Sequence, residues 1–387
     1  MELRYLIYKR LQRVLAILAM VCLIIFSSCS KKSEINILDA ALASEHFAIK
    51  RVMDSLEGFE LQIRYTQINR RNDSVLLTDF DFQVDENTYF YPASTVKFPA
   101  AVAALEKLNQ LDSLHMNTRF YVEGDSVATT FARSIEEIFA VSDNEANNRL
   151  VEFLGFDELN EKIATKGVEP IRIAHRLSTA DADNITTKPL VIYANDTTTV
   201  TSKPIINTAA ASLELNSIQK GIGFYGGDSL YQEPFDFSLK NFFPINSQSG
   251  LLKRVIFPEN FKEEERLDLS KEQHDFLLKS MAVLPYEAGY DRNEYYDGYV
   301  KFFMYGDTKK PMPSGIKIYN KVGYAYGTLT DCAYIIDKEN EVEFMLVATI
   351  LVNKDQIFND DNYEYDDVGI PFLAQLGREI YQRELKR

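Results

Sequence analysis

The sequence of 387 residues is poor in the side chains that build metal sites and disulfides. Its four histidines, His46, His115, His175 and His274, form no His-x-x-x-His pair, which argues against a zinc site. Two of the three cysteines fall in the first 29 residues, and Cys332 stands alone in an apolar run. An internal disulfide is therefore excluded once the N-terminal segment is removed. We interpret Cys332 as a small, buried, apolar side chain. We expect no metal and no cofactor.

Positive charge is outnumbered, since 42 Lys and Arg residues face 57 Asp and Glu residues, and the formal net charge is −15. Such an acidic surface repels phosphate backbones, so nucleic acid is not expected as a partner. The acidic run at 359–367, NDDNYEYDD, lacks the regular oxygen spacing of an EF-hand calcium loop. We interpret this run as a solvated loop.

No apolar run is long enough for a relaxed bilayer span of about 20 residues. The longest near the N-terminus is Val14–Phe26, which follows four basic residues and is typical of the apolar core of a secretory signal. The small residues SS before Cys29 resemble a bacterial lipobox, in which this cysteine is lipidated. A plain signal peptide or a short anchor helix is the alternative. The interpretation predicts a signal peptide at 1–28, a tether at 29–36, and a lipid-anchored protein facing the periplasm.

Residues 37–387 are expected to form one catalytic domain, because strand patterns at both ends of the chain flank a helical middle. This order predicts an α+β fold, an α/β sandwich with one antiparallel sheet built from both chain ends. The sheet lobe would span about 37–92 and 290–387, and the helical lobe about 93–289, with an enlarged loop at about 178–245. Within that loop, 184–207 is typical of a hairpin and 221–237 of a glycine-rich loop. The expected helices are 37–58, 94–111, 134–140, 144–154, 156–167, 249–258, 269–285 and 369–385. The expected strands are 59–69, one or two within 73–91 that are split by a turn around 85–87, 315–327, 329–337 and 341–352.

A serine–lysine pair opens the apolar helix at 94–111, in the stretch YFYPASTVKFPAAVAALEKLN. Ser-x-x-Lys occurs four times in the chain, so its spacing alone proves nothing. Ser94, however, would lie in the first helical turn, where free N–H groups and the helix dipole stabilise an oxyanion. Lys97 lies one turn on, and a buried lysine can become neutral enough to accept the serine proton. An N-cap serine with a surface lysine is the structural alternative.

Two further motifs occur once each in the chain. Ser142-Asp143-Asn144 could be no more than an N-cap, since all three residue types favour that position. Lys321-Val322-Gly323 puts a glycine inside a strand, which weakens the strand unless something approaches its backbone closely. Taken together and in this order, the three motifs indicate a functional site rather than three unrelated structural features.

The series Ser-x-x-Lys, Ser-Asp-Asn and Lys-x-Gly closely resembles that of class A β-lactamases and penicillin-binding proteins. The resemblance runs from about Leu38 to the final helix. It implies a serine hydrolase that opens β-lactam amides through an acyl-enzyme. By that resemblance Ser94 is the nucleophile, Lys97 its proton acceptor, and Ser142 passes the proton to the leaving nitrogen.

The resemblance also implies the substrate contacts. Asn144 would hold the substrate amide, and Lys321 would supply positive charge for the substrate carboxylate. Gly323 would let the strand edge approach, and the N–H groups of Ser94 and Tyr324 would form the oxyanion hole. The expected partners are a small-molecule β-lactam or D-amino-acid peptide and, through Cys29, the membrane; a monomer is expected.

The chain departs from the family at two places. The deacylating glutamate of a Glu-x-x-Leu-Asn motif is absent from 169–184; Glu169 comes too early, and Asp181 and Asp183 are the only substitutes offered. Val322 replaces the usual Thr or Ser, which removes a hydroxyl for the substrate carboxylate. Two alternatives therefore stay open: a penicillin-binding-protein-like D-Ala peptidase or esterase, and a non-hydrolysing binding protein.

Overall fold

A computed structural model describes residues 2, 4, 5, 7, 8, 36–72, 74–125 and 127–387. Residues 37–387 form one compact unit. Within the described residues no helix is both long and apolar enough to cross a bilayer. Cys29 and nearly all of the predicted signal peptide and tether lie outside the described residues.

The centre of this unit is a five-stranded antiparallel sheet in the order β11-β12-β13-β1-β2. Strand β1 comes from the start of the domain and pairs with β13 from its end, from Leu61 opposite Ile350 to Gln67 opposite Phe344. The sheet is thus assembled from both chain ends, and the predicted fold class is confirmed. The strands are β1 Leu61–Arg71, β2 Ser74–Phe82, β11 Ile316–Ala325, β12 Thr328–Asp337 and β13 Val342–Leu351.

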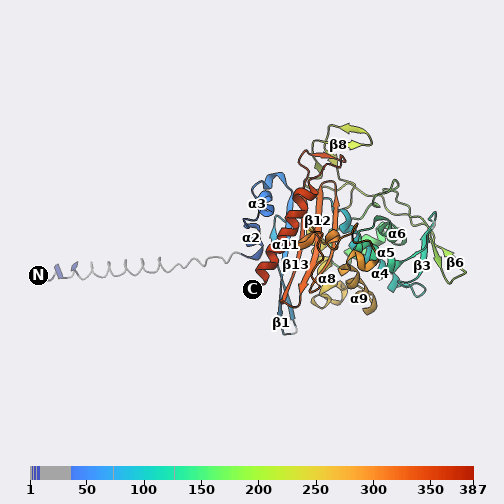
Figure 1. Cartoon of the computed structure of the whole chain (residues 1–387), viewed down its shortest axis with the longest axis horizontal. Helices are drawn as coiled ribbons and strands as arrows, with labels where there is room; N and C mark the ends of the chain where they lie inside the picture. Colours follow the sequence, from blue (N-terminus) through green and yellow to red (C-terminus); the bar gives the residue numbers. More distant parts are fainter. Residues whose placement is uncertain (1, 3, 6, 9–35, 73, 126) are drawn as a thin grey trace. The chain divides into compact units, whose positions relative to one another are not determined.

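Both faces of the sheet are covered, which explains why β12 and β13 are buried along nearly their whole length. Successive side chains of a strand point to opposite faces. Accordingly Leu346 and Ala348 of β13 pack with the terminal helices, whereas Met345 and Val347 pack with the helical middle. Helices α2 Ile37–Leu42, α3 Phe47–Met53 and α11 Ile370–Glu384 lie on the first face, and α8 Ile245–Ile256 lies on the second (Figure 1).

Helix α4, Lys97–Asn109, runs through the helical lobe and is buried on nearly all sides. A helix that is apolar all round is typical of a protein interior, and the small side chains of Ala100–Ala104 let neighbouring helices approach. Helices α5 Phe131–Ala140, α6 Asn144–Leu154 and α7 Phe156–Ala164 contact α4, while α9 Lys271–Ala282 packs on α5 and β11. The short α10 is Phe302–Tyr305.

Two sequence expectations are corrected here. The helix expected at 37–58 is two short helices, because the chain turns before His46, whose Nδ1 caps α3 by accepting from the N–H of Ala48. The loop expected at 221–237 contains a hairpin, β8 Gly223–Gly226 with β9 Ser229–Tyr231, joined by β14 Ile357–Phe358. Stacking of Phe224 on Tyr231 supports this pairing, and Gly227-Asp228 forms the turn between the two strands.

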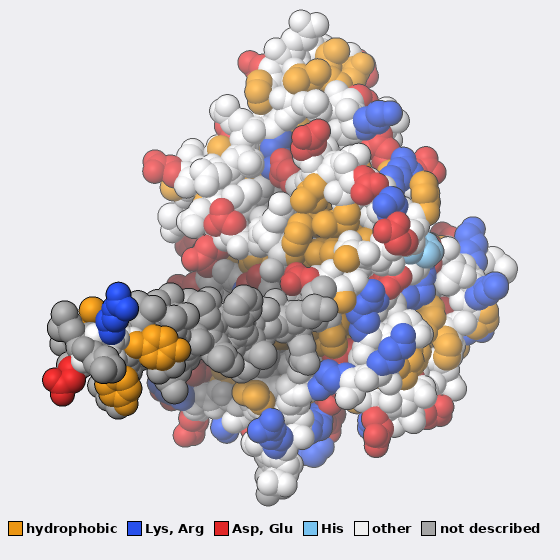
Figure 2. Space-filling view, turned by 90° about the vertical axis from the view of Figure 1, so that its left-hand side faces the viewer, with side chains coloured by type: hydrophobic (Ala, Val, Ile, Leu, Met, Phe, Trp, Pro, Cys, Tyr) orange, Lys and Arg blue, Asp and Glu red, His pale blue; other side chains and the backbone are white. Residues whose placement is uncertain are grey.

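The predicted hairpin at 184–207 is confirmed as β5 Leu190–Tyr193 with β6 Thr199–Thr201. It extends a small sheet with β3 Arg119–Val122 and β4 Thr129–Thr130, a pairing that the sequence did not indicate. Strands β7 Gln219–Lys220 and β10 Phe235–Asp236 form a further pair. The β8–β9 hairpin exposes apolar side chains such as Leu230 and Tyr231, and apolar atoms gather at the top of Figure 2, where this hairpin lies.

Candidate active site

Ser94 lies in a tight turn at the entrance of α4. The turn is a 3₁₀ segment, Ala93–Val96, and the α-helix begins only at Lys97, so Ser94 precedes the first α-helical turn in which it was expected. Ala93 has φ 47°, in the left-handed region, and Thr95 Oγ1 donates to Pro92 O at 2.6 Å. The turn presents Ser94, half-buried, on the wall of a cleft.

Lys97 is fully buried and holds the Ser-Asp-Asn segment against α4. Its Nζ donates to the carbonyl oxygen of Ser142, to Asn144 Oδ1 at 2.6 Å and to Ser142 Oγ at 3.3 Å. Within the described residues it has no hydrogen bond to Ser94. Burial lowers the pKa of Lys97 to about 7, although the Asp143 carboxylate opposes this shift. A large fraction of Lys97 is therefore neutral at neutral pH and able to accept a proton.

Ser142 lies between two lysines. Lys321 Nζ donates to Ser142 Oγ at 2.8 Å and to the Val322 carbonyl oxygen at 2.6 Å. Burial and the neighbouring Lys97 together lower the pKa of Lys321 well below its usual range. Ser142 itself has φ 59°, and the N-cap of α6 is its neighbour Asp143, which accepts from the Ala146 N–H at 2.6 Å. The Ser142 hydroxyl is thus free to relay protons.

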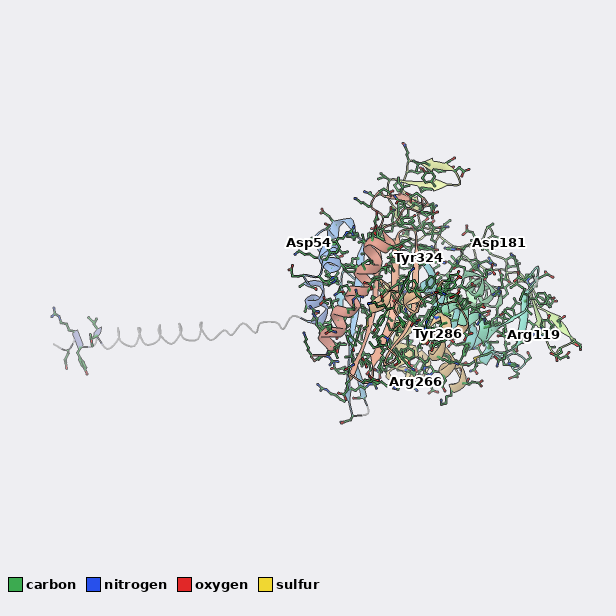
Figure 3. All side chains as sticks on the ribbon, viewed as in Figure 1. Asp54, Arg119, Asp181, Arg266, Tyr286 and Tyr324 are labelled. Carbon is green, nitrogen blue, oxygen red and sulfur yellow. The ribbon has the colours of Figure 1, made fainter. Side chains whose placement is uncertain are left out.

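Gly323 is the point where strand β11 touches the Ser94 turn. A Cβ added to Gly323 would lie 2.6 Å from Ser94 N and 3.0 Å from Pro92 O, closer than real Cβ atoms come to backbone. Only glycine therefore allows this approach. Tyr324, labelled in Figure 3, follows on the same edge strand; it is exposed and lines the cleft.

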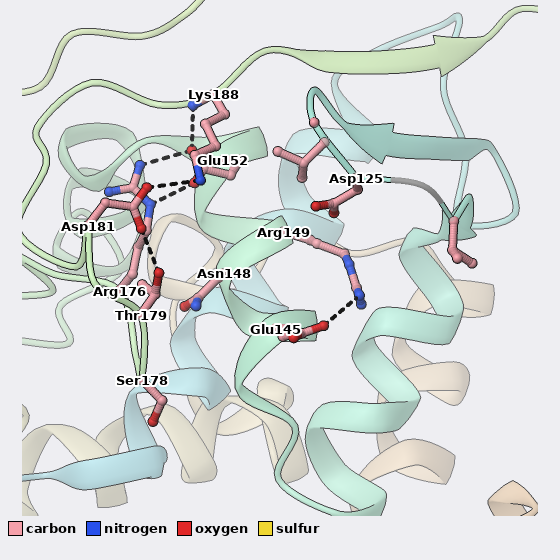
Figure 4. Close-up of a pocket in the computed structure, with 13 residues that line it drawn as sticks. Asp125, Glu145, Asn148, Arg149, Glu152, Arg176, Ser178, Thr179, Asp181 and Lys188 are labelled. Atoms are coloured by element: carbon pink, nitrogen blue, oxygen red, sulfur yellow. Dashed lines mark hydrogen bonds and ion pairs between the residues drawn. The ribbon is translucent and has the colours of Figure 1, made fainter.

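The loop between α7 and β5 contributes no carboxylate to the cleft. Glu169 is exposed, and so is Asp183. Asp181 lies in a neighbouring pocket of about 460 Å³, where it accepts from Thr179 Oγ1 at 2.6 Å and pairs with Lys188 at 2.9 Å (Figure 4). These contacts lower the pKa of Asp181 to about 2. In the cleft itself, Ser178 Oγ accepts from Asn144 Nδ2 at 2.9 Å.

The cleft has a volume of about 780 Å³ and a wall of tyrosines that sequence reasoning missed. Part of this wall comes from the acidic segment interpreted as a solvated loop, since Asn359, Asp361, Tyr363 and Tyr365 line the cleft. In the sequence, Tyr363 and Tyr365 alternate with acidic residues, and this pattern could have indicated that the segment contributes to a binding surface. The tyrosines that line the cleft are Tyr91, Tyr295, Tyr299, Tyr324, Tyr326, Tyr363 and Tyr365.

Residues 47–213 match a family model described as the beta-lactamase enzyme family. No curated protein matches the chain in a sequence search. Similar solved structures include a class A β-lactamase from Bacteroides cellulosilyticus, with 12% identity, a TM-score of 0.51, and coverage of 88% of this chain and 98% of that one. A β-lactamase from Sphaerobacter thermophilus shows 13% identity and a TM-score of 0.50, covering 90% and 96%.

A structure named PBP-A is also similar, with 14% identity, a TM-score of 0.51, and coverage of 91% of this chain and 97% of that one. At such identities the structural likeness establishes the fold. The family match spans the Ser94, Lys97 and Ser142 motifs and ends before Lys321, which the shared fold brings to the same site. The sequence match and the shared fold agree with the predicted resemblance: residues 47–213 are similar to the beta-lactamase enzyme family, and the chain has the fold of the class A β-lactamases and of PBP-A.

Proposed function

We propose that the protein opens β-lactam amides through an acyl-enzyme on Ser94. The observation that carries this proposal is the buried Lys97, whose ammonium group contacts both Ser142 and Asn144 and whose pKa is lowered to about 7. A lysine in this state can take the proton of a nearby serine at neutral pH.

The reaction starts with attack of Ser94 Oγ on the lactam carbonyl carbon, while the serine proton passes to neutral Lys97. The ring C–N bond then breaks, and the ring nitrogen takes a proton from Ser142, which recovers one from Lys97. Lys321 lies beside Ser142 and becomes fully charged when a substrate carboxylate binds, because an opposite charge favours the charged form. The product of this half-reaction is an ester on Ser94.

Hydrolysis of that ester is expected to be slow. The loop that would carry a glutamate presents Ser178 to Asn144, and none of its carboxylates at 169, 181 and 183 lines the cleft. A positioned base contributes roughly 10²–10⁴-fold to such a step. A long-lived acyl adduct with weak turnover is the expected behaviour.

Intact-mass spectrometry after incubation with a penicillin tests this proposal. The wild type should gain one penicillin mass, and Ser94→Ala should gain none. Ser314→Ala is a matched control, because Ser314 opens another Ser-x-x-Lys but is exposed on the surface. An adduct that persists in Ser94→Ala would move the active site elsewhere.

A penicillin-binding-protein-like D-Ala peptidase or esterase is the second candidate. The cleft volume of about 780 Å³ and its seven tyrosines favour a substrate with an extended side chain, such as a D-amino-acid peptide. One similar structure is a PBP-A mutant as an acyl-enzyme complex with penicillin-G, which shows that this neighbour is acylated by a β-lactam. Release of D-Ala from a D-Ala-D-Ala peptide would favour this candidate. Acylation without any turnover would favour a binding protein.

We also propose that the protein is a monomer anchored to the membrane through a lipid on Cys29 and facing the periplasm. The proposed anchor rests on the N-terminal sequence, in which a charge-free apolar run ends in small residues directly before Cys29.

A further inference from the structure

Lys240 lies near the end of the enlarged loop and lines the same cleft as Ser94. Its side chain is half-buried. Within the described residues, no carboxylate lies within 4 Å of its ammonium group, and this group makes no hydrogen bond. An ammonium group that is partly withdrawn from water and has no anionic partner favours the binding of an anion from outside the chain.

The other charged side chains on the described wall of the cleft are differently placed. Arg176 is occupied by an ion pair with Glu152 at 2.6 Å. Asp143 is occupied as the N-cap of α6, and Asp361 is exposed and does not pair with Lys240. Among the described residues that line the cleft, Lys240 is therefore the one cation that is free to bind an anionic group.

The backbone around Lys240 is fixed by buried hydrogen bonds. Arg172 Nε donates to the Lys240 carbonyl oxygen at 3.2 Å. The next residue, Asn241, is fully buried and accepts through Oδ1 from the N–H groups of Ala174 at 2.8 Å and His175 at 3.2 Å. Only the side chain of Lys240 is left to adjust, so a ligand meets an anchor whose position is largely set in advance.

Lys240 and Lys321 belong to different parts of the site. Burial and the charge of Lys240 lower the pKa of His175 to about 4, so the ammonium group lies near this ring. The ring stacks on Tyr91, with centroids 6.3 Å apart and planes 5° apart, and Tyr91 precedes the nucleophile by three residues. Lys321 instead contacts Ser142 Oγ at 2.8 Å.

We propose that Lys240 binds a second carboxylate of the substrate, on the acyl side of the reacting amide, an inference that rests on the proposed function. Ser142 serves the leaving nitrogen, so the amine part of the substrate lies beside Lys321 and the acyl part extends into the rest of the cleft, where Lys240 lies. One ammonium group matches one carboxylate, whereas a phosphate calls for more cations than the described wall offers. The preferred substrate is a β-lactam or D-amino-acid peptide with a carboxylate on each side of that amide.

The test uses penicillins that differ only at the end of the side chain. Acylation of the amine of 6-aminopenicillanic acid gives side chains with two, three or four methylene groups that end in a carboxylate or in the matching primary amide. Intact mass of the full chain over time gives the second-order acylation constant for each compound. At the chain length that reaches Lys240, the acid should acylate the wild type about fivefold or more faster than the amide.

Lys240→Gln and Lys240→Met remove the charge and should lower the ratio of acid to amide to about one or below, because the chain is acidic, with a net charge of −15. Lys240→Arg keeps the charge and should keep the preference. Lys203→Gln is the matched control, since Lys203 is an exposed lysine of the same enlarged loop. A wild-type ratio of one or less at every chain length, or a preference that survives in Lys240→Gln, overturns this inference alone. Failure of the wild type to form any penicillin adduct on Ser94 overturns the proposed function and this inference with it.

Discussion

Six non-glycine residues that line the cleft have left-handed backbone conformations. Three of them lie beside the proposed reacting groups: Ala93, with φ 47°, Ser142, with φ 59°, and Ser178, with φ 51°. Each such conformation costs on the order of 1–3 kcal/mol and persists only where surrounding contacts hold it. Here the Pro92 carbonyl, the two lysines and Asn144 supply those contacts. These backbone conformations orient the segments that carry the Ser94 and Ser142 hydroxyls. A regular α-helical turn would orient them differently.

Acylation should depend on pH through Lys97. Because its pKa is about 7, the neutral form grows as the pH rises from 5.5 to 8.5, and the second-order acylation constant should rise with it. Lys97→Ala should lower that constant by roughly 10²–10⁴-fold and remove the pH dependence. A fluorescent penicillin measures the acylation constant and its pH dependence for the wild type and for Lys97→Ala. Thermal unfolding must first show that the variant is folded. A wild-type profile that is flat over this range would contradict the assigned role.

Val322→Thr should improve acylation by β-lactams that carry a carboxylate. Val322 lines the cleft beside Lys321 and is only 2% exposed, so a hydroxyl there would be sheltered from water. A gain of about fivefold in the acylation constant corresponds to about 1 kcal/mol for one hydrogen bond. Val322→Ala controls for the change in packing, and a substrate esterified at its carboxylate should show no gain. Equal effects on the acid and its ester would count against this role.

At the scale of elements, the site is the junction of a helix, a loop and a strand edge. Helix α4 brings Lys97 into the interior, the start of α6 brings Ser142 and Asn144, and β11 brings Lys321 and Gly323. Strand β11 is at the edge of the sheet and pairs only with β12, which leaves its other side open toward the Ser94 turn. An edge strand in this place can accept a substrate backbone as well as the nucleophile.

Gly323→Ala should disrupt this junction. The new Cβ would meet backbone atoms of the Ser94 turn at 2.6 Å, so the strand or the turn must move. Overpacking of this kind costs roughly 1–3 kcal/mol, and we expect a lower melting temperature and at least about a 10-fold loss in acylation rate. Gly58→Ala is the matched control, because a Cβ at Gly58 meets nothing within 4 Å. Full acylation by Gly323→Ala would show that the close approach is dispensable.

At the scale of the whole molecule, the two ends of the domain are joined in one sheet by β1 and β13. Helices α2 and α11, also from opposite ends, pack together on that sheet. A chain shortened at either end of 37–387 would therefore lose part of its core.

Cys29→Ala should abolish incorporation of labelled palmitate and release the protein from membranes. The physical reason is the N-terminal sequence, in which an apolar run long enough for export but short for a bilayer span ends at Cys29. The Cys332→Ala variant should still incorporate labelled palmitate at Cys29, since the Cys332 thiol is buried in the folded domain. Persistent labelling of Cys29→Ala, or a mature N-terminus at another residue, would rule the anchor out.

Much of this protein could be derived from its sequence alone. Periodicity located most of the helices and strands because period 3.6 and period 2 are local consequences of burying one face. The order of Ser94, Lys97, Ser142 and Lys321 along the chain indicated the chemistry, since those residue types are needed for acyl transfer. The errors at 43–46 and 221–237 concern turns, whose geometry depends on single caps and contacts.

Only the tertiary structure decided which side chains meet and in what charge state. The lowered pKa of Lys97 follows from burial by helices far away in sequence, and the tyrosine wall joins segments around residues 91, 295, 324 and 363. The same holds for the loop, where Asp181 faces a neighbouring pocket and His175 faces the cleft. Burial and electrostatics are sums over neighbours in space, so a linear pattern names the reacting groups and the folded chain sets their reactivity.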